Sequence, residues 1–196
     1  MNYELHTIAG RKPPQGTSLI MKLGRSPGSV RVQIRLPGET KWTDLGDLGI
    51  KDGAVELPLH LAFLCHATED EHRVRPIARR LRADGVLTWF SPHPDDLVGG
   101  ASWKREIEGA MEGADFVVAF LSKKSTTKTG FVQHELKLAF ELMRLRPFGA
   151  RFILPVLLED FEPPREFRDF HWIEFWQSDG YQRLLESLRQ PPLRDD

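Results

Sequence analysis

The chain has 196 residues, of which 40% are apolar and 28% are charged, with 27 basic against 28 acidic side chains. This composition is typical of a folded protein and excludes a chain that is disordered throughout. A formal net charge of −1 gives no overall basic surface, so we expect no nucleic-acid partner bound through its phosphates. The single cysteine excludes an internal disulfide, and no run approaches the roughly 20 apolar residues that span a bilayer. Residues 1–10 lack the pattern of a signal peptide, so we expect a cytoplasmic protein without membrane contact.

Residues 1–57 predict a small antiparallel β lobe. Apolar side chains at positions 30, 32, 34 and 36 alternate with polar ones, which is the pattern of a half-buried strand. Shorter strands are expected over 17–23 and 54–57, and Gly46 and Gly49 interrupt the segment between them. We interpret the lobe as an extension that packs against the main domain; the alternative is a separate binding function. The predicted organisation is therefore an extension over 1–57, a main domain over 58–190 and a tail over 191–196.

From residue 59 onward, apolar strands alternate with amphipathic helices. The expected strands are 59–65, 86–90, 116–121, 152–158 and 172–175, and the expected helices are 69–83, one starting at Ser102, 131–145 and 181–188, with a polar loop over 123–129. This alternation predicts an α/β fold, a flavodoxin-like five-stranded parallel sheet with helices on both faces. Such sheets bind ligands beyond the carboxyl ends of the strands, so the loops after Cys65, Phe90 and Leu121 are the expected place of a site.

The helix that begins at Ser102 carries a glutamate with small neighbours. Glu106 lies beside the apolar stripe of this helix, and its helical neighbours include Ser102, Gly109 and Ala110. A glycine here costs about 1 kcal/mol of helix stability relative to alanine, which indicates that the space beside the carboxylate has a use. The alternative is that Glu106 is an ordinary solvated glutamate and that Gly109 serves close packing.

The loop that follows the second expected strand of the main sheet contains possible metal ligands. His93, Asp95 and Asp96 resemble the signature of zinc-dependent N-acetylglucosamine deacetylases. However, Leu97 stands where a glutamate usually follows, and no later His-x-x-His supplies a third ligand. We therefore expect no metal site and interpret the segment as a loop stiffened by prolines.

Several segments, in the right order and at matching spacing, resemble Toll/interleukin-1 receptor (TIR) domains. They are 62–70 (AFLCHATED), 100–107 (GASWKREI), 116–122 (FVVAFLS), 130–136 (GFVQHEL) and 153–160 (ILPVLLED). The resemblance covers about residues 59–190, and it implies the same parallel-sheet fold that the strand and helix pattern predicts. The lobe over 1–57 has no counterpart in this resemblance.

The resemblance also implies an activity. Many bacterial and plant TIR domains cleave the bond between nicotinamide and ribose in NAD+, and some do so in anti-phage signalling. By this resemblance Glu106 is the catalytic carboxylate, NAD+ is the substrate, and neither a cofactor nor a metal is needed. The substrate-binding residues expected around it are Cys65, His66, Trp89, Phe90, Ser102, Trp103 and Ser122. Trp89 and Phe90 would offer a stacking surface for an aromatic ring, and at least one of them is expected to pack in the core instead.

The resemblance further implies that TIR domains self-associate, and that the loop over 91–101 of one copy completes the pocket of another. A separately encoded sensor or effector protein is a further expected partner. Three departures from the family pattern concern this region. Cys65 stands where serine is usual, Ser91 stands where an aspartate often follows the second strand, and the loop carries a two-residue insertion around His93 and Pro94. The competing function is a non-enzymatic interaction module that signals by self-association, in which Glu106 is only a surface acid.

Overall fold

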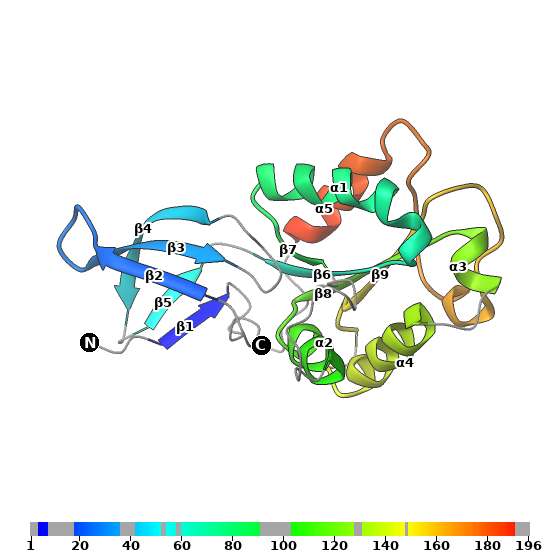
Figure 1. The fold of residues 1–196 in the computed structure, drawn as a ribbon, viewed down its shortest axis with the longest axis horizontal. Coiled ribbons are helices and arrows are strands. Elements are labelled where there is room, and N and C mark those ends of the chain that lie inside the picture. Colours follow the sequence, from blue (N-terminus) through cyan, green and yellow to red (C-terminus); the bar gives the residue numbers. More distant parts are fainter. Residues whose placement is uncertain are drawn as a thin grey trace.

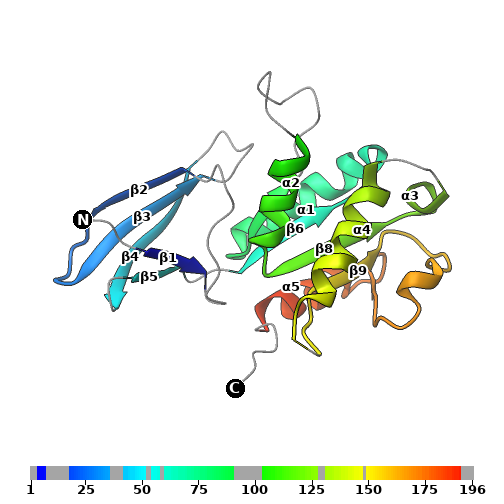
Figure 2. The same ribbon diagram turned by 90° about the horizontal axis from the view of Figure 1, so that it is seen from below.

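The computed structural model describes residues 4–7, 18–35, 42–51, 54–57, 60–90, 103–127, 131–147 and 149–190. These residues form two separate five-stranded sheets. The first sheet builds an N-terminal lobe, and the second lies between two layers of helices in the rest of the chain (Figures 1 and 2).

The N-terminal lobe consists of strands in the spatial order β1-β5-β4-β3-β2. The strands are β1 (Glu4–Thr7), β2 (Ser18–Leu23), β3 (Ser29–Arg35), β4 (Thr43–Lys51) and β5 (Ala54–Leu57). β2 to β5 pair in antiparallel fashion, and β1 adds a parallel pairing to β5. The predicted alternation in β3 is confirmed, because Val30, Val32 and Ile34 are buried and the residues between them are half-buried.

The glycines after residue 42 do not interrupt the lobe, contrary to the prediction, because the nine-residue strand β4 runs through them. Gly46 adopts a φ of 76°, which a residue with a side chain rarely tolerates. At this point the register shifts, so that Val32 lies opposite Gly46 whereas Gln33 lies opposite Asp44. The glycine therefore accommodates a bulge within the strand rather than ending it.

The main sheet is entirely parallel and has the order β10-β9-β8-β6-β7. Its strands are β6 (Leu61–Cys65), β7 (Leu87–Phe90), β8 (Phe116–Leu121), β9 (Ile153–Leu157) and β10 (Ile173–Glu174). Every residue of β6 and β8 is buried, as expected for strands covered on both faces. The predicted α/β fold with a flavodoxin-like strand order is confirmed.

Helices cover both faces of this sheet (Figure 1). The short helix η1 (Thr68–Asp70) leads into α1 (Glu71–Ala83), which packs with α5 (Gly180–Arg189) on one face. Helices α2 (Trp103–Glu112) and α4 (Phe131–Arg144) cover the other face, and η3 (Arg165–Phe167) also packs there through Phe167. None of the described helices is long and apolar enough to cross a bilayer.

The segment after β8 is a short helix, α3 (Lys123–Thr127), where the sequence analysis expected a loop. Two serines stabilise its start by bonding to each other's backbone. The Ser122 amide donates to Ser125 Oγ at 2.8 Å, and the Ser125 amide donates to Ser122 Oγ at 3.1 Å. This reciprocal capping satisfies amides that have no partner within the helix, so five polar residues suffice to form a turn of helix.

Candidate functional site

The carboxyl ends of three neighbouring strands meet at one edge of the main sheet. β6 lies between β7 and β8, with Leu64 opposite Phe90 and Cys65 opposite Ala119. The last described residues of these three strands therefore lie at neighbouring points of the same edge. This edge is where a parallel sheet offers ligands a crevice, so we take it as the candidate site.

The structure divides the predicted site residues between the two faces of the sheet. Cys65 and Trp89 point into the layer of α2 and α4, whereas Phe90 packs on the face covered by α1 and α5. This division follows from the alternation of side chains along each strand. Residues that are adjacent in sequence therefore take different environments at the same edge.

Cys65 is completely buried against a buried carboxylate. Its side chain is 0% exposed, and Glu135 of α4 is 1% exposed. Burial raises the pKa of the Cys65 thiol well above its usual value, and the charge of Glu135 and its hydrogen bond to the thiol act in the same direction. The thiol is therefore protonated at neutral pH and shielded from solvent in this conformation. The sequence offered no signal for the buried role of Glu135.

We expect Cys65 to resist thiol reagents in the folded protein. Nucleophilic attack requires that the thiol is deprotonated and that the reagent can reach it. Burial of Cys65 opposes deprotonation and blocks access. In native buffer, labelling by a disulfide reagent that releases a coloured thiol should be at least about 100-fold slower than in concentrated denaturant. Equal labelling rates in the two conditions would contradict this burial.

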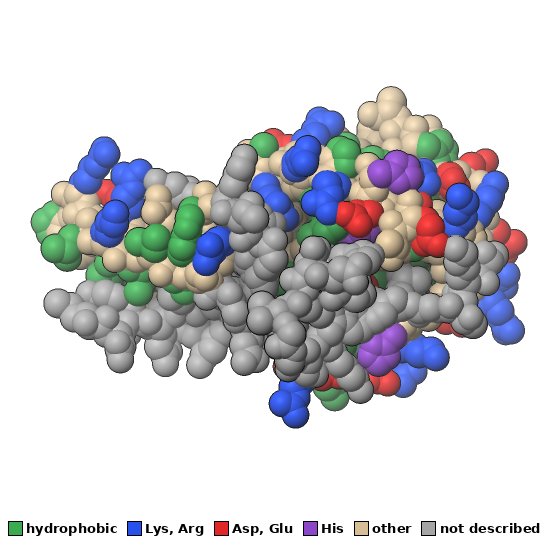
Figure 3. Space-filling view, in the orientation of Figure 1, with side chains coloured by type: hydrophobic (Ala, Val, Ile, Leu, Met, Phe, Trp, Pro, Cys, Tyr) green, Lys and Arg blue, Asp and Glu red, His purple; other side chains and the backbone are tan. Residues whose placement is uncertain are grey.

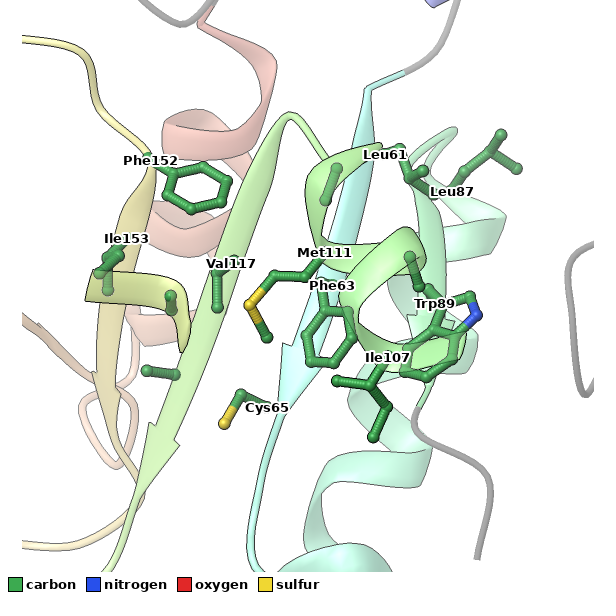
Figure 4. Close-up of a cluster of buried hydrophobic side chains, with 14 of the residues drawn as sticks. Leu61, Phe63, Cys65, Leu87, Trp89, Ile107, Met111, Val117, Phe152 and Ile153 are labelled. Atoms are coloured by element: carbon green, nitrogen blue, oxygen red, sulfur yellow. The ribbon is translucent and has the colours of Figure 1, made fainter. Parts of the chain in front are cut away.

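Trp89 forms part of the core on the same face. Its ring is 1% exposed and stacks on Phe63 with the ring centroids 4.6 Å apart and the planes at 19°. Ile107 and Met111 of α2 belong to the same cluster, and Figure 4 shows these side chains together beneath α2. The two faces of the indole are thus in contact with protein. Its predicted contact with substrate is untested and stays a prediction.

On the opposite face, His66 and Phe90 lie together at the sheet edge. Both residues are half-buried, and their ring centroids are 4.4 Å apart. His66 Nδ1 donates to the Leu64 carbonyl at 3.2 Å, while the Arg75 guanidinium lies 5.1 Å from the centre of the Phe90 ring. Arg75 also forms an ion pair with Glu71 one turn earlier in α1. The arrangement is a small aromatic surface with a cation at its side.

Burial lowers the pKa of His66 below its usual value, which makes the protein sensitive to acid. The unfolded chain binds this proton more readily than the folded protein, so His66 reduces stability as the pH falls below about 6.5 and has no such effect at higher pH. We expect His66→Gln to lose less unfolding free energy than the wild type between pH 7.5 and pH 5.5, as measured by urea titration. His134→Gln, at an exposed position of α4, is the control that should follow the wild type. A wild-type pH dependence in His66→Gln would contradict the effect.

Ser122 is buried in a polar network at the same edge. Its hydroxyl donates to Asp70 Oδ2 at 2.6 Å, and the two residues are 1% and 3% exposed. Arg73 Nη1 lies 3.4 Å from Asp70 Oδ1 and 3.5 Å from Glu159 Oε2. Arg73 also donates through Nη2 to the Leu158 carbonyl at 2.5 Å. These bonds tie the start of α1 to the ends of β8 and β9, and they occupy the Ser122 hydroxyl with protein partners.

Several residues considered for a site in the sequence analysis, whether accepted or rejected there, lie outside the described part of the chain. These are Ser102 and the loop over 91–101, including His93, Asp95 and Asp96, together with the side chains of Trp103 and Glu106. The backbone at position 106 is in α2, in the first turn of the helix and next to the buried Ile107. Within the described residues, no group of three or more His, Cys, Asp and Glu side chains is suited to hold a metal ion.

Comparisons with known proteins show what this part of the chain resembles. A model of the TIR domain family matches residues 62–188. The TIR domain of the Toll-related receptor TRR-2 from Hydra magnipapillata superposes with a TM-score of 0.53 at 17% identity, covering 66% of this chain and 98% of its own. A prokaryotic SEFIR domain superposes with a TM-score of 0.50 at 13% identity, covering 67% and 99%. The TIR domains of the activated Roq1 resistosome give 0.42 at 24% identity, covering 51% and 58%. No curated protein matches the chain.

Proposed function

The chain belongs to the TIR domain family, and on that premise we propose that it is an NAD+ glycohydrolase or cyclase with Glu106 as its catalytic carboxylate. The proposed activity cleaves the nicotinamide–ribose bond without a bound cofactor. We place it in the cytoplasm of a bacterium, where the product would serve as a messenger in anti-phage signalling.

The observation that carries this proposal is the location of position 106. It lies in the first turn of α2, the helix that follows β7, and the helix packs through Ile107 and Met111 beneath the sheet. The first turn of a helix after a parallel strand lies near the carboxyl edge, where ligands bind. In the family resemblance, the catalytic glutamate is found on the same helix and at the same place.

A carboxylate at this point suits the chemistry of NAD+ cleavage. When the bond between C1′ of the ribose and the nicotinamide nitrogen breaks, both electrons leave with nicotinamide, which becomes neutral. The ribose is left with an oxocarbenium-like positive charge that a nearby carboxylate stabilises. Water then attacks C1′ and loses a proton to give ADP-ribose, whereas attack by the adenine of the same molecule gives a cyclic product.

The half-exposed rings of His66 and Phe90 support the binding of a planar group at the same edge. A flat aromatic ring gains favourable contacts on such a surface, and Arg75 next to Phe90 supplies a positive charge for an anionic substrate. Three of the residues expected to bind substrate are buried: Cys65, Trp89 and Ser122. In our proposal they support the residues that line the site and do not contact the substrate in this conformation. Ser102 and Trp103 complete the proposed set from the start of the α2 segment.

The direct test is incubation of the concentrated protein with NAD+, followed by chromatography and mass measurement of the products. Release of nicotinamide by the wild type and not by Glu106→Ala supports the enzyme. The mass of the second product then separates hydrolysis, which adds water, from cyclisation, which does not.

The competing function is a TIR module that signals by self-association alone. Under this alternative, neither protein releases nicotinamide, even in samples that light scattering shows to be oligomeric. Such a result would overturn the proposed enzyme and leave assembly, with itself or with a separately encoded sensor or effector, as the function.

A further inference from the structure

Among the strands that the structure describes, β2 lies at the end of the sheet of the N-terminal lobe, with β3 as its neighbour on one side. Figure 2 shows β2 along the margin of the lobe. A strand at a sheet edge carries backbone N–H and C=O groups that point away from the sheet and can pair with another strand. The family match begins at residue 62, so this edge lies outside the part of the chain that it covers.

Of the features that usually protect an edge, β2 has one exposed lysine and no proline. In Ser18–Leu23 (SLIMKL) only Lys22 is charged. Leu23 is 90% exposed, the highest exposed fraction among the large hydrophobic residues of the described chain. Figure 3 shows hydrophobic side chains on the surface of this lobe. An apolar edge of this kind favours pairing with a further strand.

We propose that a second copy of this chain occupies the edge, with the two β2 strands paired antiparallel around a two-fold axis at Met21. In an antiparallel pair, the side chains of two directly opposed residues lie on the same face of the sheet. A symmetric pair of β2 strands therefore needs a register in which the apolar residues of one copy lie opposite the apolar residues of the other. With Met21 opposite Met21 of the second copy, Leu23 lies opposite Leu19. The exposed Leu23 then gains an apolar neighbour, and the apolar row formed by 19, 21 and 23 continues across both lobes.

The side chains on the other face of β2, Ile20 and Lys22, are also compatible with this register. Ile20 lies opposite Lys22 of the second copy, so no two like charges face each other directly. A register centred on Ile20 would pair residues 18–22 and leave Leu23 beyond the pairing. β2 is therefore self-complementary in the Met21 register.

The size of this interface predicts its behaviour. The five paired residues of each strand, 19–23, bury much less than the roughly 1,200 Å² of a standard stable interface, so we expect a weak and concentration-dependent dimer. Such a contact would raise the local concentration of two TIR domains without fixing them permanently. The inference does not rest on the proposed NAD+ cleavage, since it concerns the N-terminal lobe alone.

A cross-linking experiment on the full chain tests the register. Met21→Cys places two thiols opposite each other at the two-fold axis, within the Cα separation that a disulfide tolerates. Lys22→Cys is the matched control on the same strand, because its two copies lie on a diagonal of about 7–8 Å and cannot be bridged without movement. The native Cys65 is buried and does not interfere.

Under mild oxidation at high protein concentration, we expect Met21→Cys to form a covalent dimer at a rate at least about tenfold above that of Lys22→Cys. Equal rates for the two variants, or no dimer from either, would overturn the proposal.

A second measurement uses charge on the other face and does not depend on cross-linking. Ile20→Glu brings a carboxylate opposite Lys22 of the second copy, whereas Ile20→Lys brings a second cation to the same place. The two-fold axis makes each contact between positions 20 and 22 occur twice in the dimer. We therefore expect the dimer of Ile20→Glu to have a dissociation constant at least about tenfold lower than that of Ile20→Lys, as measured by sedimentation equilibrium. Similar constants, or a wild type that stays monomeric at all concentrations, would refute pairing through β2. Assays of NAD+ cleavage are independent of either readout.

Discussion

Glu106→Gln is expected to lower the rate of NAD+ cleavage by at least about 100-fold, the usual cost of removing one group that stabilises charge in a transition state. Glutamine keeps the size of the side chain and its hydrogen-bonding capacity but removes the negative charge that opposes the oxocarbenium ion. The loss should fall on kcat more than on KM, because this charge develops only as the bond to nicotinamide breaks. Nicotinamide release, followed by chromatography over a range of NAD+ concentrations, gives both constants.

The matched control is Glu112→Gln, which removes the same charge from an exposed position at the end of α2. It should keep wild-type kcat and KM, and both variants should unfold at the temperature of the wild type. If Glu106→Gln cleaves NAD+ at the rate of Glu112→Gln, the catalytic role of Glu106 is refuted.

The second large effect concerns Trp89. Trp89→Ala is expected to lower the free energy of unfolding by about 3–5 kcal/mol, because it removes a buried aromatic ring and leaves a cavity against Phe63. Denaturant titration followed by circular dichroism measures this loss. The control is Trp176→Ala, at a position that is 38% exposed, which should cost much less.

This pair of variants also separates the two roles considered for Trp89. A core residue loses stability when truncated, and activity falls only with the folded fraction. If Trp89→Ala instead retained the unfolding free energy of the wild type and lost NAD+ cleavage with a raised KM, Trp89 would act in the site, and the packing role inferred from its burial would be wrong.

Elements whose pattern reflects their own burial could be predicted from the sequence. β6 and β8 are continuous apolar runs because helices cover both of their faces, and β3 alternates because one face is buried. β4 and α3 were missed because their formation depends on contacts outside the local pattern. A bulge at Gly46 allows β4 to continue through its glycines. Reciprocal hydrogen bonds between the backbone amides and hydroxyl groups of Ser122 and Ser125 stabilise the start of α3.

From the sequence alone we could predict the strands of the parallel sheet and the helix on which Glu106 lies, because apolar runs and helical periodicity mark these elements along the chain. The strand order was inferred from the fold class, because no local run records which strands lie side by side. The environment of the other candidate residues depends on tertiary contacts. Alternation along a strand predicts that Cys65 and His66 point to opposite sides, but it does not tell which layer of helices each one meets. Packing then buried Cys65 against Glu135, stacked Trp89 on Phe63 and left His66 and Phe90 half-exposed at the edge. These contacts join residues that are distant in the sequence, and for that reason no local pattern records them.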